Sequence, residues 1–366
     1  MTKTLRPDKT IQKFLISTTS RLVGEYEKSN ILITHAWPDF ANHTVSRILT
    51  PGPASRSSYT FVFKTEPYEE KIPDVPEYSP LGEIICTYLS ILYGKRFDNH
   101  GQVEGSGFFR LPDLSAFNHL CHPHIPQNSH SPRVDLAIPL NLGEFKRIER
   151  LMSDNSIDER FINTLNTAGK FYLQALQNFE YDPEVSYLHL ITAGEILSNY
   201  FDYDKEELLD NETKKTLLKI ETEMSKGNKI ASFIKGKLWQ VKRRFVNALC
   251  QLVNDDFFTR TESSENSGAL KVDEFKEKIE NAYDLRSRYV HTGASFRSWL
   301  SFGVGANFEV PIGRPVVDNK EYGDILAKAP TYIGLERIIR YCLLRFIQIH
   351  GEVFIDERLS NSKSKQ

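Results

Sequence analysis

Long apolar runs are missing from this chain of 366 residues, and none approaches the roughly 18 consecutive apolar residues of a membrane-spanning helix. The segment from Met1 to Pro7 also lacks the hydrophobic core of a secretory signal. We therefore expect a cytoplasmic protein without a membrane partner.

Cysteine is scarce, with only four residues, Cys86, Cys121, Cys250 and Cys342, and no CxxC pair. This wide spacing is typical of free thiols in a reducing compartment and indicates no disulfide framework. Metal-ligand residue types gather only once, at His119, Cys121, His122, His124 and His130. Prolines within that segment predict an irregular loop, whereas zinc sites usually have an ordered pair-and-pair spacing. Zinc binding there is the less favoured alternative, and we predict no metal or other cofactor.

The motifs GxxxxGK[ST], GxGxxG and GxSxG are all absent, so nucleotide hydrolysis by those routes is not supported. A net charge of −2 also excludes a generally basic coat for nucleic acid. Any affinity for RNA must therefore come from a local patch.

Positive charge is concentrated between Glu223 and Asp255, where seven basic residues and no acidic residue occur. The seven are Lys226, Lys229, Lys235, Lys237, Lys242, Arg243 and Arg244. This patch predicts contacts with an RNA backbone that weaken as salt rises. The alternative is an ordinary solvated helix face, paired with the acidic stretch between Asp202 and Glu223.

Two parts of the chain differ in pattern. Residues 1–150 mix short apolar runs with proline and glycine, which predicts an α+β domain whose role its residues do not name. Strands are expected over 31–37 and 57–64, and a buried helix over 81–93 ends at Gly94 before a glycine-containing loop.

From about residue 156 the pattern becomes mainly helical, and a long glycine-rich loop is expected over 292–330. Helices are expected over 161–179, 184–201, 214–224, 229–253, 272–290 and 332–350. We therefore predict a mainly α protein with a mixed domain over 1–150, a helical-bundle domain over 155–355 and a flexible tail over 356–366.

The most informative segment is the helix expected over 272–290. Apolar residues recur there at helical spacing, at Val272, Phe275, Ile279, Ala282, Tyr283 and Val290. Arg286 falls in the same stripe, where a buried guanidinium needs a partner. A polar line of Glu280, Asp284, Ser287 and His291 follows a second face.

Arg286 and His291 together suit RNA cleavage. A guanidinium matches a phosphate, and an imidazole both takes and gives a proton near neutrality. A histidine would deprotonate the 2′-hydroxyl, which attacks the neighbouring phosphate, and a protonated histidine would assist the leaving 5′-oxygen. The five-residue spacing separates the two side chains by about 140° around a regular helix. Either the chain turns His291 back after Val290, or two copies of the helix share one site, which we favour.

On spacing alone, a purely structural interpretation is equally good. Arg286 and Arg288 would pair with Asp284 and Glu280 on a solvated helix, and His291 would interact with the helix dipole at its C-terminus.

The segment YDLRSRYVHTG, residues 283–293, carries Arg286-x-x-x-x-His291 and resembles the signature of HEPN domains. Residues 186–197, in which Glu195 interrupts an apolar run, resemble the earlier helix of the ApeA-like branch of that family. The two helices occur in the family's order, and the likeness extends over about residues 155–355.

The resemblance implies a homodimer whose motifs face each other, and in many members a metal-independent ribonuclease of toxin–antitoxin or anti-phage defence. It assigns catalysis to Arg286 and His291, with support from Asp284 and Ser287. Many active members have Asn, Asp or His in the place of Ser287, and some members are inactive and only bind nucleotides or partners. An antitoxin or a phage-derived trigger would then control the activity, with the first domain as sensor or substrate recruiter.

Glu195 lies near the apolar boundary of its predicted helix, where a free carboxylate is costly. We therefore predict that it pairs with Arg286 or Arg288 and orients the arginine. RNA contacts are expected from Arg288, Lys235, Lys237, Lys242, Arg243 and Arg244.

Overall fold

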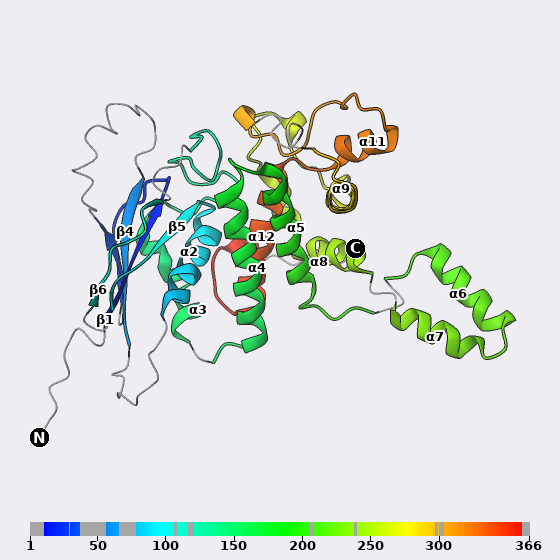
Figure 1. Cartoon of the computed structure of the whole chain (residues 1–366), viewed down its shortest axis with the longest axis horizontal. Helices are drawn as coiled ribbons and strands as arrows, with labels where there is room; N and C mark the ends of the chain where they lie inside the picture. The colour runs from blue at the N-terminus through cyan, green and yellow to red at the C-terminus, as the bar shows by residue number, and fades with distance from the viewer. Residues whose placement is uncertain are drawn as a thin grey trace, which may run out of the picture.

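Helices predominate in the computed structural model, with an antiparallel sheet at the N-terminal end (Figure 1). The structure describes residues 11–28, 30–36, 56–65, 78–105, 108–115, 121–154, 156–204, 208–237, 240–296, 299 and 304–360. The predicted combination of a mainly α chain with a mixed N-terminal region is confirmed at this level.

Six strands form the sheet in the order β2-β3-β4-β1-β5-β6. They are β1 (Ile11–Thr18), β2 (Tyr26–Lys28), β3 (Ile31–His35), β4 (Ser57–Lys64), β5 (Phe97–Gly105) and β6 (Phe108–Phe109). The predicted strands at β3 and β4 are confirmed. The loop predicted after Gly94 was wrong, since β5 lies there and pairs with β1. The prediction took Gly101 as a loop residue. Gly101 has a left-handed φ of 87° and lies where the register between β1 and β5 shifts, so it marks a bulge within a strand.

Helix α2 (Ser79–Tyr93) lies between the sheet and the central helices (Figure 1). Its buried residues include Ile85, Leu89 and Leu92, and it ends as predicted at Gly94, which takes a left-handed conformation. Because α2 contacts both β5 and α4, it joins the N-terminal region to the helical region.

The central helices are α4 (Glu159–Asn178), α5 (Pro183–Ser198), α8 (Val241–Leu252), α9 (Phe275–Thr292) and α12 (Tyr332–His350). Helix α12 packs against α2, α4, α5 and α8, as its nearly complete burial requires. One core cluster runs from Phe14 in the sheet to Leu359 near the C-terminus. The core therefore crosses the predicted boundary near residue 150, and two separately folding domains stay a prediction.

Shorter elements complete the fold, namely α3 (Arg150–Ser153), α11 (Lys320–Lys328), η4 (Leu142–Arg147), η5 (Asp255–Thr259), η6 (Asn266–Gly268), η7 (Val304–Ala306) and η8 (Glu357–Leu359). Helix α11 corrects the prediction of a loop over 292–330. Its side-chain cap at Asn319 and its buried Ile325 and Leu326 are the local signals that the glycines of this stretch obscured.

The helix predicted over 229–253 was also wrong, because the chain forms two helices there, α7 (Gly227–Lys237) and α8. Gln240, at the start of α8, has a left-handed φ of 46°, which a continuous helix does not allow. The two helices serve different partners. Helix α7 packs against α6 (Asn211–Glu223), whereas α8 packs against α5, α9 and α12.

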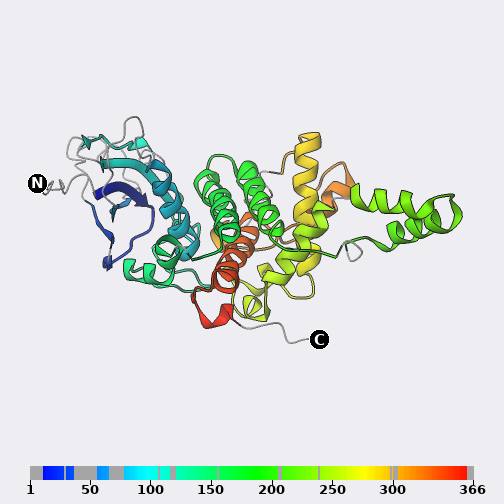
Figure 2. The ribbon, with the colours of Figure 1, turned by 90° about the horizontal axis from the view of Figure 1, so that it is seen from below.

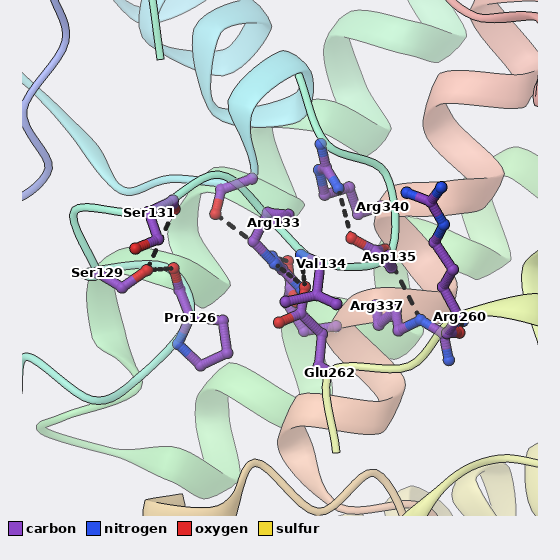
Figure 3. Close-up of polar contacts among 12 residues, drawn as sticks. Pro126, Ser129, Ser131, Arg133, Val134, Asp135, Arg260, Glu262, Arg337 and Arg340 are labelled. Atoms are coloured by element: carbon purple, nitrogen blue, oxygen red, sulfur yellow. Dashed lines mark hydrogen bonds and ion pairs between the residues drawn. The ribbon is translucent and has the colours of Figure 1, made fainter. Parts of the chain in front are cut away.

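A buried ionic cluster links residues 133–135 to α12 and to two loops. Arg133 binds Glu262 at 2.7 Å and Glu336 at 2.7 Å, and Tyr172 donates a hydrogen bond of 2.5 Å to Glu336. In Figure 3, Asp135 lies between Arg340 and Arg337, at 3.2 Å and 3.7 Å. Arg337 also binds Glu309 at 2.9 Å. These side chains are almost completely buried, so each charge depends on the others for compensation.

We expect Asp135 to make the stability of the fold depend on pH in the acid range. Burial disfavours the Asp135 carboxylate, but Arg340, Arg133 and Arg337 outweigh burial and lower its pKa. Such a carboxyl stabilises the fold above its unfolded pKa of about 4, and this contribution is lost as pH falls toward the lowered folded pKa. We expect Asp135→Asn to be less stable than wild type at pH 7, with a shallower loss of stability below about pH 4. Urea unfolding at stepped pH measures both slopes; equal slopes would contradict the assignment.

No helix in the described part of the chain combines the length and the apolar character needed to cross a membrane. Cys86, Cys121, Cys250 and Cys342 all lie within the described residues, and none of them is part of a disulfide.

Candidate functional site

Helix α9 carries the motif, and it presents a narrower apolar face than the sequence predicted. Phe275, Ile279, Ala282 and Leu285 are buried. Val272, outside the helix, and Val290, on it, are 60% and 52% exposed, so their predicted place in the core stripe was wrong. Leu285 takes the core position that the prediction gave to Arg286. The guanidinium is consequently only half-buried, with a side-chain exposure of 28%.

Arg286 is held on the side of α9 that faces α5. Its guanidinium lies 3.7 Å from the Glu195 carboxylate, and its central carbon lies 5.6 Å from the centre of the Tyr283 ring. Burial, followed by the charge of Glu195 and a hydrogen bond to it, raises the pKa of Tyr283 to about 12. The predicted pairing of Glu195 with Arg286 is therefore present, and Glu195 fixes two neighbouring side chains.

His291 lies in a surface pocket of about 280 Å³ at the other side of the same helix end. The residues that line it are Asp284, Ser287, Arg288, His291 and Thr292 from α9, and Glu321 and Ile325 from α11. Three members of the predicted polar line meet here, and Glu280 is not among the lining residues. The pocket is open and mostly polar, which suits a charged, solvated substrate more than an apolar ligand.

One copy of the chain does not bring Arg286 and His291 to a common pocket. Arg286 is not among the lining residues. The alternative in which the chain turns His291 back after Val290 is contradicted, because α9 continues through Thr292 and ends at Gly293, whose φ is 68°. The two side chains thus keep the angular separation of a regular helix.

Two other residues of the pocket have partners outside α9. Asp284 accepts hydrogen bonds from Lys242 on α8 at 2.6 Å and 2.7 Å, and Arg288 binds Glu321 on α11 at 2.5 Å. The structural interpretation was wrong in pairing the α9 arginines with Asp284 and Glu280, but His291 does lie in the last turn of α9, as that interpretation predicted. The side chain of Glu321 is 72% exposed, so its ion pair with Arg288 contributes little to stability.

Three of the seven residues of the predicted basic patch, Lys235, Lys242 and Arg243, pair with acidic side chains. Lys235 binds Glu221 at 3.2 Å, and Arg243 binds Asp210 at 2.7 Å. Arg244 lies 5.4 Å from the centre of the Tyr203 ring. The pairs of Lys235 and Arg243 agree with the alternative of a helix face paired with the stretch 202–223. The side chain of Lys237 lies outside the described residues.

Sequence reasoning missed the α11 residues of the pocket and the contribution of Tyr283 to the Glu195 contact. Glu321 and Ile325 reach the pocket through the packing of α11 on α9, and no local sequence pattern indicates that contact.

The proposed zinc alternative gains no support from the residues that the structure describes. The rings of His122 and His124 lie 5.5 Å apart, and His119 is outside the described range. Over those residues, no three His, Cys, Asp or Glu side chains are grouped to hold a metal.

Comparison of the chain with models of protein families, with curated proteins and with solved structures found no match.

Proposed function

We propose that the chain is an endoribonuclease that cuts RNA through its 2′-hydroxyl at a site shared by two copies of α9. The observation that carries this proposal is the arrangement of that helix end. His291 stands in an open polar pocket beside Arg288, and Glu195 holds Arg286 on the adjoining face. The resemblance of residues 155–355 to HEPN domains supports the same assignment.

The chemistry needs only groups that the chain supplies. The imidazole of His291 takes the proton of the 2′-hydroxyl, and the resulting oxygen attacks the adjacent phosphorus. The bond from phosphorus to the 5′-oxygen breaks, and a protonated histidine gives that oxygen a proton. The products are a 2′,3′-cyclic phosphate and a 5′-hydroxyl. Arg286 stabilises the added negative charge on the phosphate, with Arg288 as a second cation at the pocket. DNA is not a substrate because it lacks the nucleophile.

A homodimer can bring Arg286 and His291 together, which a single copy does not do. In a two-fold contact the same surface of each copy meets the other, so the exposed end of one α9 faces the exposed end of its partner. Val290, next to His291 and half-exposed, is then covered in the contact. Arg286 of one copy can thereby approach His291 of the other. Ser287 and Asp284 act as supporting polar groups of the shared site.

The first test is incubation of purified protein with total RNA in the presence of a chelator, followed by analysis of the fragment ends. We expect cleavage with cyclic phosphate ends by wild type, and a loss of about 10²–10⁴-fold in His291→Ala because an acid–base group is removed. His122→Ala replaces an exposed histidine outside the pocket and serves as the matched control.

Cleavage that persists in His291→Ala would place the active site elsewhere. RNA that stays intact with wild type but binds equally well to His291→Ala would favour the alternative of an inactive RNA- or nucleotide-binding module. If neither binding nor cleavage occurred and Arg286→Ala mainly lowered stability, the chain would be a structural interaction protein.

A further inference from the structure

Helices α6 and α7 form an arm that projects from the body of the molecule, at the end opposite to the sheet (Figure 2). The two helices pack mainly against each other. Leu209, Leu217 and Ala231 form a small core of their own, separate from the main one. Because this hairpin contributes little to the main core, its exposed surface is a candidate for a binding role.

The arm is a basic part of a slightly acidic chain. Residues 211–237 contain seven lysines and three glutamates, a net charge of +4 in a protein of net charge −2. Five of the lysines are exposed, namely Lys214, Lys215, Lys219, Lys226 and Lys229. Among the lysines of the arm that the structure describes, Lys235 forms an ion pair, with Glu221. The exposed lysines therefore present uncompensated charge, unlike Lys242 and Arg243 at the base of the arm.

The exposed groups are arranged at helical spacing. Lys215 and Lys219 are one turn apart on the face of α6 that points away from Leu217, and Lys229 and Phe233 stand in the same relation on α7. Phe233 is 67% exposed. Lysines that meet phosphates, together with an exposed aromatic ring on which a base stacks, are the combination that binds single-stranded nucleic acid.

The base of the arm is connected to the pocket by two consecutive residues of α8. Arg243 binds Asp210 at 2.7 Å and donates to the carbonyl oxygen of Leu208, so it holds the start of the arm. Its neighbour Lys242 holds Asp284, which lines the pocket of His291. The arm and the pocket are thus both attached to the first turn of α8.

We propose that the α6–α7 arm binds single-stranded RNA through Lys215, Lys219, Lys229 and Phe233, and guides it to the α9 pocket. This inference rests on the proposed function for its destination, but not for the binding itself. RNA is favoured over a protein partner by charge complementarity, because a polyanion matches a surface of net positive charge with dispersed apolar side chains.

The test uses full-length protein and a labelled RNA of about 20 nucleotides carrying 2′-O-methyl groups, long enough to contact both the arm and the body. Such RNA lacks the nucleophile, so binding is measured without cleavage. Replacing Lys215, Lys219 and Lys229 together with glutamine is expected to weaken binding about 10–100-fold near 0.1 M salt and to reduce the slope of log affinity against log salt by about 2. Glutamine retains helix propensity. Phe233→Ala is expected to weaken binding about fivefold or more.

The matched control replaces three exposed lysines outside the arm, Lys170, Lys271 and Lys276, with glutamine. Its affinity and salt slope should equal those of wild type. If the arm variant bound RNA as well as this control, the proposal would be overturned. It would also be overturned if the arm variant kept its RNA affinity and lost dimerisation in sedimentation, which would assign the arm to a second copy.

A dinucleotide substrate separates this proposal from the proposed function. It is too short to reach from the pocket to the arm, so the arm variant should cleave it at the wild-type rate while cutting long RNA more slowly. Equal cleavage of long RNA by the arm variant and wild type would contradict the guiding role. RNA binding that depends on the arm, without any cleavage by wild type, would support RNA binding by the arm and contradict the proposed ribonuclease activity.

Discussion

Glu336→Ala is expected to destabilise the fold by about 3–5 kcal/mol, because it removes one member of a buried ionic cluster and leaves its partners charged. Glu336 accepts two hydrogen bonds from Arg133, at 2.9 Å and 2.7 Å, and one from Tyr172. Arg133 keeps Glu262 and the carbonyl oxygen of Gly94, which compensate only part of its charge and donors. Urea denaturation followed by circular dichroism measures the free energy of unfolding.

Glu321→Ala is the matched control for this effect, since it removes a carboxylate from an exposed ion pair with Arg288. We expect it to cost less than about 1 kcal/mol. Equal effects of the two substitutions would mean that groups other than Glu336 compensate the charge of Arg133.

Mixing Arg286→Ala and His291→Ala proteins is expected to restore cleavage that neither variant shows alone. Each variant homodimer lacks one essential group in both copies. A heterodimer retains one Arg286 and one His291 on different copies, which is the combination that a shared site needs. After random exchange of subunits the cleavage rate should rise from about a hundredth of wild type or less to about a quarter of it. A fluorogenic RNA reports the rate after joint refolding.

A mixture of Arg286→Ala with the double variant Arg286→Ala/His291→Ala controls for refolding, because no dimer in it contains Arg286. It should stay inactive. Absence of rescue in the first mixture, with heterodimers demonstrated by two affinity tags, would show that the two groups do not act across a dimer.

The elements that the sequence predicted best are those with a long apolar pattern at regular spacing. Helix α12 has the predicted bounds, 332–350, and β4 has the predicted bounds, 57–64. Strand β1 was not predicted, although it pairs with both β4 and β5 at the centre of the sheet. Nothing in a single strand shows which partners it will have. The apolar pattern over 229–253 looked continuous in the sequence, but it consists of two stripes, on α7 and α8, that face different helices.

The candidate site was predictable where it is local and unpredictable where it depends on tertiary contacts. The polar line on α9 is a matter of helical spacing, and Asp284, Ser287 and His291 do line one pocket. The pairing of Glu195 with Arg286 followed from the cost of a carboxylate near an apolar boundary. The pairing of Lys242 with Asp284 joins residues 42 positions apart, which no pattern along either helix encodes.

The buried ionic cluster also limits how this chain can evolve by exchange of modules. Asp135 and Arg133 come from the first 150 residues, whereas Arg337, Arg340 and Glu336 belong to α12. Recombination that replaced the N-terminal segment with an unrelated sequence would remove Arg133 and Asp135 and leave their charged partners buried in the protein. We therefore expect the two segments to be inherited as a pair, with new specificity arising in the exposed loops and in the arm.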